Sequence, residues 1–370
     1  MLSFCINFVF PRNRNKMQQT QENQQNRKQI QRVILWGFKL HYNTHSYIHN
    51  AFYRAFQSLN VPVFWFDDSD LAHVNSMELS HTLFITEHNT NKNIPCRSDC
   101  LYFSHYVDAG DYPGVPKENI IVLKVSQRDF TEEDKDLGKN ITYDPLEYGQ
   151  PWEYHAFIDG YHCLYLYWAT DILPNEIDEN IAKLKSGALE EKKRREVHFI
   201  GYFEEIWVYF KYLLGDRGIP FYKHGGAFSF HSHENRSIDQ NMDLVQTSLI
   251  SPALQSDHQV KHRYIPCRIF KNISYGRMGV TNNPAVQELF SLGGHEILCT
   301  RDMNELIDGS IGFENTSFEN RLSKIVPLME YVRDHHTYYN RIASFCRFLE
   351  DYTDFTFPIP SLGLPTTYVA

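Results

Sequence analysis

The sequence lacks a long apolar run, an excess of basic residues and a regular array of cysteines, and each absence excludes a class of protein. No apolar segment reaches the roughly 20 residues that a membrane-spanning helix needs. The net charge of −9 argues against the basic surface on which nucleic acids bind, so we expect no nucleic-acid partner. The seven cysteines are odd in number and scattered, which favours free thiols in a reducing compartment and predicts a cytoplasmic protein.

Signals for secretion and for metal binding are also weak. Residues 1–10 are apolar, but basic residues follow this segment instead of preceding it, so we expect no signal peptide; weak membrane association of this tip stays open. His231-Ser232-His233 and His335-His336 have no carboxylate or cysteine at metal-ligand spacing, so we predict no metal site.

Length and pattern instead indicate two globular α/β domains. A chain of 370 residues is long for a single hydrophobic core. Short apolar strands alternate with helical segments, which is typical of a doubly wound fold. We predict a disordered leader over residues 1–31, a first domain with its linker over 32–195, a second domain over 196–350 and an extended tail over 351–370. The boundary is placed near Glu196 because residues 185–196 are dense in charge and read as a solvated link.

Predicted strands of the first domain end in polar residues. Strands are expected over residues 32–37, 61–66, 83–86, 101–106 and 120–125, with a helix over 45–56. Because the carboxyl ends of parallel strands meet at one edge of a sheet, polar residues there are candidates for a binding site. The candidates are His41, Asn43, Thr44, His45 and Ser46 after the first strand, and Glu87, His88 and His105 after later ones.

His45 is the candidate catalytic residue of this group. Its ordinary pKa near neutrality suits a general base that removes the proton of a hydroxyl group. The alternative is a helix cap, in which Thr44 or Ser46 caps the following helix and His45 is merely exposed. Glu87, His88 and His105 have the corresponding alternative of being ordinary loop residues.

The second domain contains a helix-strand-helix unit over residues 263–290 whose start and stop signals are clear in the sequence. Pro266 introduces a helix over 267–275 that Gly276 ends, a short strand follows over 278–281, and Pro284 starts the next helix. The polar residues of this unit suit phosphate, ribose or sugar, and the backbone of Gly201 at an earlier strand end does so too. These polar residues are Arg268, Lys271, Asn272, Ser274, Thr281, Asn282 and Asn283. The alternative is that they form the solvated face of an ordinary helix.

Residues 251–290 resemble the nucleotide-sugar segment in the carboxyl-terminal domain of GT-B glycosyltransferases, of the kind found in families 1 and 4. In that family a helix whose first turn faces the donor is followed by glycine, a short apolar strand and a polar loop, as in residues 270–276 and 278–282 here. The chain departs from the family at Lys271, where a glutamate often binds the donor ribose. The strand, loop and helix over residues 32–56 are similar to the unit that opens the amino-terminal domain of the family.

The resemblance implies an α/β fold of two Rossmann-like domains that face a cleft, and transfer of a sugar from a nucleoside diphosphate sugar to a glycan or other hydroxyl acceptor. Arg268 and Lys271 would neutralise the diphosphate, and the other polar residues of the unit would contact ribose or sugar. His45 would be the base if the reaction inverts the anomeric carbon, whereas a retaining reaction needs no such base. No Asp-x-Asp motif is assigned to a strand end, so we expect a metal-independent reaction without a cofactor.

Two alternative functions share these residues. A nucleotide-sugar epimerase or hydrolase on the same fold would use Glu87, His88 and His105 at the anomeric carbon. A non-catalytic carbohydrate-binding protein is favoured by the missing ribose glutamate. The Asn272-Ile-Ser glycosylation sequon lies within the expected site, where a glycan would block binding, and this again favours an intracellular chain.

Overall fold

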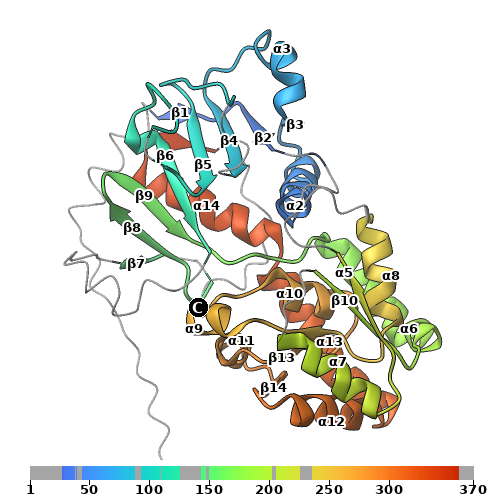
Figure 1. Ribbon diagram of the computed structural model, residues 1–370. Helices are drawn as coiled ribbons and strands as arrows, with labels where there is room; N and C mark the ends of the chain where they lie inside the picture. Colours follow the sequence, from blue (N-terminus) through green and yellow to red (C-terminus); the bar gives the residue numbers. More distant parts are fainter. Residues whose placement is uncertain are drawn as a thin grey trace, which may run out of the picture.

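The computed structural model describes residues 27–37, 39, 44–87, 93–108, 110–125, 143–146, 150–201, 206–225 and 236–357. They form two α/β halves, one around a large sheet and one around smaller parallel sheets covered by helices (Figure 1). This is the predicted fold class.

The first half is built on an eight-stranded sheet with the order β3-β2-β4-β5-β6-β9-β8-β7. Its parallel part runs from β3 to β9, and β8 and β7 continue it in antiparallel pairing. The central strands are almost wholly buried because aromatic and branched apolar residues fill both of their faces. The strands are β2 (Arg32–Trp36), β3 (Val63–Phe66), β4 (Thr82–Glu87), β5 (Leu101–His105), β6 (Ile120–Lys124), β7 (Tyr143–Pro145), β8 (Tyr154–Ile158) and β9 (Tyr161–Tyr165).

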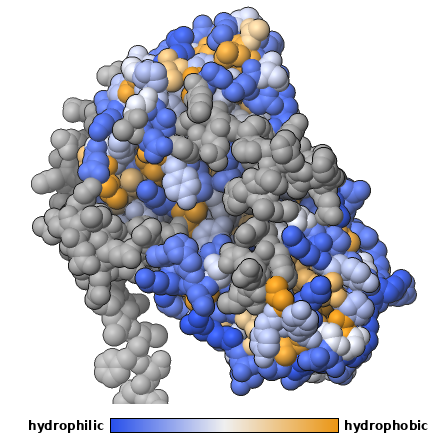
Figure 2. Space-filling model, viewed as in Figure 1, coloured by the Kyte–Doolittle hydropathy of each residue, from blue (hydrophilic) through white to orange (hydrophobic). Residues whose placement is uncertain are grey.

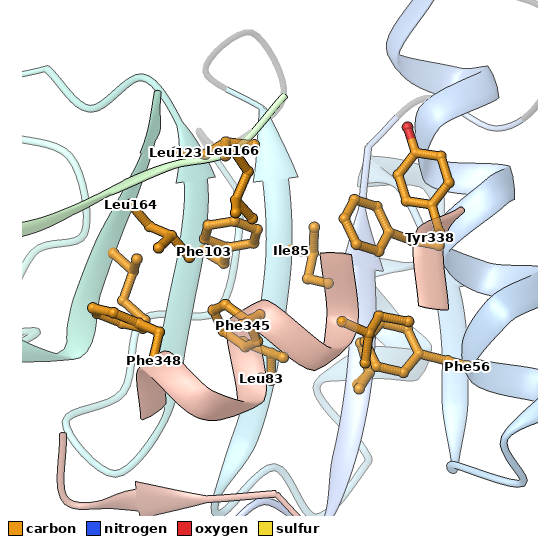
Figure 3. Close-up of a cluster of buried hydrophobic side chains, with 14 of the residues drawn as sticks. Phe56, Leu83, Ile85, Phe103, Leu123, Leu164, Leu166, Tyr338, Phe345 and Phe348 are labelled. Atoms are coloured by element: carbon orange, nitrogen blue, oxygen red, sulfur yellow. The ribbon is translucent and has the colours of Figure 1, made fainter. Parts of the chain in front are cut away.

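Helices α2 (Thr44–Ser58) and α14 (Tyr338–Tyr352) cover one face of this sheet. Figure 3 shows Phe345 and Phe348 of α14 packed against Phe103 and Leu164 of the strands. The last long helix of the chain therefore returns to the first half of the structure. The short helix α3 (Leu71–Val74) belongs to a second cluster on the opposite face.

Both predicted ends of the folded region are wrong. Order was expected to begin at Arg32, and the residues after Asp354 were expected to form an extended tail. Instead β1 (Lys28–Gln29) pairs in parallel with β15 (Phe355–Thr356). Ile30, Phe355 and Phe357 are buried in the core of the first half, so apolar burial holds both segments in place.

The second half contains the parallel pair β10 (Val197–Ile200) and β11 (Phe221–His224) and the parallel sheet β12 (Pro252–Ala253), β13 (Val280–Thr281) and β14 (Leu298–Cys299). The predicted unit around residue 270 is confirmed: α10 (Cys267–Ser274) ends at Gly276, whose φ of +98° favours glycine, and α11 (Pro284–Leu292) follows β13. The other helices are α7 (Ile206–Asp216), α8 (Ile238–Thr247), α9 (Asp257–Lys261), α12 (Met303–Glu314) and α13 (Phe318–His335).

Helices α5 (Pro174–Lys185) and α6 (Ala188–Lys192) pack with the second half, because Ile177, Leu184 and Leu189 share a core cluster with α10 and α13. The domain boundary near Glu196 stays a prediction, and this packing favours a boundary before α5. The charged stretch expected to be a solvated link is instead anchored: Lys193 Nζ lies 2.5 Å from Glu314 Oε2, and Arg321 Nη2 lies 2.7 Å from Glu190 Oε2. Its charges are paired, which explains why a run that reads as a linker folds against the domain.

The described surface in the view of Figure 2 is mostly hydrophilic, with apolar residues in small separate groups. Among the described residues, no helix combines the length and apolarity needed to cross a membrane.

Candidate functional site

A chain of close polar contacts between Glu87, His45 and His105 lies at the carboxyl edge of the large sheet. Glu87 and His105 are the last residues of the neighbouring strands β4 and β5 and are paired in register, and His45 is in the first turn of α2. His45 Nδ1 lies 2.5 Å from Glu87 Oε2, and His45 Nε2 lies 3.0 Å from His105 Nδ1. Three residues predicted separately as site candidates are thus brought together by the topology of the sheet.

Burial sets the protonation of the surrounding imidazoles. Burial lowers the pKa of His105 to about 3, and the neighbouring His45, Lys124 and His49 act in the same direction. Burial also lowers the pKa of His49 to about 4, against the opposing charge of Glu87. His105 and His49 are therefore neutral at physiological pH.

The other predicted residues of the first half contribute less. Ser46 is buried, and for Thr44 the structure gives the backbone alone, as the first residue of α2. His41, Asn43 and His88 lie outside the described residues.

One expectation about the sequence is wrong: an Asp-x-Asp triplet, Asp68-Ser69-Asp70, does follow a strand, β3. Its carboxylates serve local structure. Asp67 and Asp70 form a reciprocal capping box around the 3-10 helix of residues 68–70, and Asp70 Oδ2 lies 2.5 Å from Lys39 Nζ. Because the residues cap this helix, the triplet gives no support to a metal site.

On the second half, Lys271 of α10 pairs with a buried aspartate that the sequence did not indicate. Lys271 Nζ lies 2.8 Å from Asp171 Oδ2, and Tyr275 donates a 2.5 Å hydrogen bond to Asp171 Oδ1. Burial would lower the pKa of Lys271, but the carboxylate of Asp171 outweighs it and the pKa is raised, so Lys271 is charged. Lys271 Nζ also lies 5.6 Å from the ring of Tyr47, two residues after His45.

Arg268, one turn earlier on α10, occupies a cradle at the carboxyl ends of β10 and β12, beside the end of β11. Its Nε donates to Ile200 O at 2.9 Å, its Nη1 donates to Leu254 O at 3.2 Å, and the guanidinium lies 4.3 Å from the ring centre of Phe199. Gly201, with φ of +134°, borders it so closely that a Cβ there would lie 2.2 Å from Arg268 Nη2. Gly201, predicted as a donor contact, is thus also the residue that admits Arg268.

The remaining predicted donor residues are engaged in internal hydrogen bonds. Asn272 donates to Ser251 O, and Thr281 donates to Ala253 O. Ser274 Oγ lies 2.7 Å from Thr170 Oγ1, while Asn282 and Asn283 bond to Gln255. These contacts join the strand ends of the second half to one another, and the donor roles of the five residues stay predictions.

Aromatic residues connect the two groups of candidates. Trp168, in the segment between the halves, meets His45 and His105 edge-on, with ring centroids 6.3 and 5.5 Å away. Burial raises the pKa of Tyr264, and Trp168 and Arg268 both oppose this shift, so both side chains lie close to the phenol. The imidazole chain and the cations of α10 therefore face one interface between the halves. Sequence reasoning missed Asp171, Trp168 and Tyr264, because none of them lies at a recognisable strand end or motif.

Comparison with known proteins gives structural likeness only. No protein-family model and no curated protein matches the sequence. Among solved structures, the chain is similar to an alpha-glucosyltransferase in complex with UDP and a 13-mer DNA containing a HMU base, with a TM-score of 0.52 at 8% identity over 85% of this chain and 98% of that one. The chain has the GT-B fold.

Two further GT-B structures are similar at lower scores. One is an alpha,alpha-trehalose-phosphate synthase (UDP-forming) from Burkholderia xenovorans, with a TM-score of 0.45, 12% identity and coverage of 83% of this chain and 78% of that one. The other is an alpha,alpha-trehalose 6-phosphate synthase from Burkholderia multivorans, with a TM-score of 0.41, 11% identity and coverage of 81% and 83%.

The GT-B fold explains why the candidates come from two distant parts of the chain. One half supplies the ends of β4 and β5 and the start of α2, and the other supplies α10 and the ends of β10 and β11. At the position where the sequence departs from the family pattern, Lys271 and Asp171 form an ion pair in place of a lone acidic residue.

Proposed function

We propose that the protein is a glycosyltransferase that transfers a sugar from a nucleoside diphosphate sugar to a hydroxyl group of a glycan or other acceptor, without a metal ion. The observation that carries the proposal is Arg268. Within the described part of the chain its charge has only carbonyl and aromatic partners and no carboxylate. A cation held at glycine-lined strand ends without a counter-ion is suited to a diphosphate.

Lys271 supports the same site in a different way. Asp171 already balances its charge, so Lys271 would add less net attraction for a diphosphate than Arg268. Lys271 lies beside Tyr47 of α2, and in this proposal the bond between sugar and diphosphate breaks between the Arg268 cradle and the imidazole chain. In this position Lys271 would stabilise the charge that develops on the leaving group.

The chain of Glu87, His45 and His105 would serve the acceptor. A carboxylate that orients an imidazole is the usual arrangement of a general base, and removal of the hydroxyl proton makes the acceptor oxygen nucleophilic. The charge of −9 argues against a nucleic-acid acceptor and favours a glycan or a small hydroxyl compound.

Nucleotide binding tests the proposal. The purified chain is titrated with UDP, GDP, CDP and dTDP and with their glucose or mannose conjugates in the presence of EDTA, and the melting temperature is followed. We expect one nucleotide family to raise the melting temperature. Arg268→Ala should weaken its affinity about 10- to 100-fold, as the loss of a charge-assisted contact does, and Lys271→Ala should weaken it less. Arg347→Ala is the matched control, since Arg347 is exposed and pairs with Glu350 in the last turns of α14, in the other half of the structure.

The outcomes separate the functions. No stabilisation by any nucleotide, or unchanged affinity in Arg268→Ala, would contradict the proposal. Donor consumed without any acceptor would indicate an epimerase or hydrolase, and binding without turnover would indicate a carbohydrate-binding protein.

A further inference from the structure

The close contacts of the imidazole chain determine where its protons lie. An ionised carboxylate carries no hydrogen, and a lone pair on His45 Nδ1 would repel Glu87 Oε2 at 2.5 Å, so Nδ1 carries the hydrogen. While His45 is neutral, its Nε2 has no hydrogen and accepts from His105 Nδ1 at 3.0 Å. Nδ1 of neutral His105 then carries the hydrogen, and its Nε2 carries the lone pair. The atom that can take up a proton is therefore on His105, although His45 is the histidine that contacts the carboxylate.

The surroundings decide where a positive charge would be stable. His105 faces Lys124 from β6, His49 from α2, the ring of Tyr106 at 4.2 Å and the edge of Trp168. Glu87 is its register partner on β4, but no carboxylate among the described residues forms an ion pair with the His105 ring. His45 lies directly against Glu87. The depressed pKa of His105 agrees with this asymmetry, because it opposes a lasting imidazolium at that ring and leaves His45 as the stable place for the charge.

We propose that Glu87, His45 and His105 form a proton relay in which His105 Nε2 takes the proton from the acceptor hydroxyl and His45 carries the resulting charge. The proton binds to Nε2 of His105, and the hydrogen on Nδ1 of His105 passes to Nε2 of His45. His45 becomes an imidazolium bonded to Glu87, and His105 stays neutral as its other tautomer. The acceptor oxygen keeps its electron pair and bonds to the anomeric carbon, while the bond to the diphosphate breaks with its electrons on the leaving oxygen.

This relay rests on the proposed function and changes its assignment of roles. His105 becomes the catalytic residue, and His45, which the sequence predicted as the base, becomes a positioning and charge-carrying residue. The proton that the relay takes up therefore belongs to the pair and not to either ring.

Tautomers can be read directly by nitrogen NMR on protein labelled with ¹⁵N-histidine, with signals assigned from His45→Gln and His105→Gln. We expect His105 to carry its hydrogen on Nδ1 at pH 8. Glu87→Gln should abolish this preference, so that the hydrogen of His105 is shared between Nδ1 and Nε2. His105 with its hydrogen on Nε2 at pH 8, or unchanged tautomers in Glu87→Gln, would overturn the relay.

A second histidine pair provides the control. His155 Nε2 lies 3.0 Å from His162 Nδ1, and in the described part of the chain no carboxylate contacts either ring as Glu87 contacts His45, although the charge of Glu118 opposes the lowering of the pKa of His162. His162→Gln should leave the signals of His45 and His105 unchanged. If the nucleotide titration establishes the donor, His105→Gln should lower kcat at least a hundredfold with donor affinity within twofold of wild type, and unchanged kcat would refute the catalytic role. Because the tautomers are measured without donor, failure of the relay and failure of the proposed function are told apart.

Discussion

Gly201→Ala should destabilise the protein mainly through Arg268, and the structure gives the size of the effect. The new Cβ would lie 2.2 Å from Nη2, and the guanidinium cannot yield without breaking its bonds to Ile200 O and Leu254 O and leaving the ring of Phe199. Hydrogen bonds from a charged donor contribute about 1.5 to 3 kcal/mol each. The φ of +134° adds about 1 to 3 kcal/mol of backbone strain for a residue with a side chain. We expect a total loss of about 4 to 9 kcal/mol.

A double-mutant cycle separates the two contributions. In the Arg268→Ala background the steric clash is absent, so Gly201→Ala should cost only the backbone strain, about 1 to 3 kcal/mol. Urea unfolding followed by tryptophan fluorescence measures all four proteins, and Gly309→Ala, at a helical glycine with open space around it, is the control. Equal destabilisation in both backgrounds would refute the argument that Gly201 exists to admit Arg268.

Three further predictions follow from buried or strained groups. Tyr106 has φ of +80° and is 55% exposed, so Tyr106→Gly should relieve strain and stabilise the chain by about 0.5 to 1 kcal/mol in urea unfolding; a loss of stability would show that its ring contributes more than its backbone costs. Asp171→Asn should leave Lys271 charged without its partner and cost about 2 to 4 kcal/mol, read from the same unfolding curves; a neutral result would mean that Lys271 turns to solvent. Because burial lowers the pKa of His49 to about 4, the unfolded chain binds its proton first, and stability should fall by about 2 to 3 kcal/mol as the pH drops from 6.5 to 4. His49→Gln should flatten that part of the stability profile, and an unchanged slope would assign it to other groups.

Local chemistry allowed much of this fold to be predicted from the sequence. Pro266 and Gly276 mark the ends of α10 because one fixes the backbone of a first turn and the other accepts a left-handed conformation. Strand ends with polar residues located Glu87 and His105, since parallel strands deliver their carboxyl ends to one edge. These signals depend only on neighbours along the chain.

The parts that were missed depend on partners far away in sequence. Asp171 lies in an irregular segment, and its importance comes only from Lys271, a hundred residues later. The run around Lys193 reads as a solvated linker until Glu314 and Arg321 are brought to it by folding. Likewise, Asn282 is a residue type suited to contact a ligand, but folding brings two loops together and its side-chain amide bonds to the backbone of Gln255. Sequence pattern identifies residue types suited to a role, and long-range contacts decide which of them are available for it.

The return of the chain to its starting half also has a consequence for synthesis. The core of the first half contains Phe345 and Phe348 of α14 and also Phe355 of β15, the strand that pairs with β1. A chain leaves the ribosome with its amino terminus first, so the large sheet emerges long before the helix that covers it. During translation the apolar face of that sheet is exposed, and chaperones or provisional contacts have to cover it until α14 has been made. Removal of residues 338–357 should leave a product that aggregates in the cell even though every strand of the sheet is present.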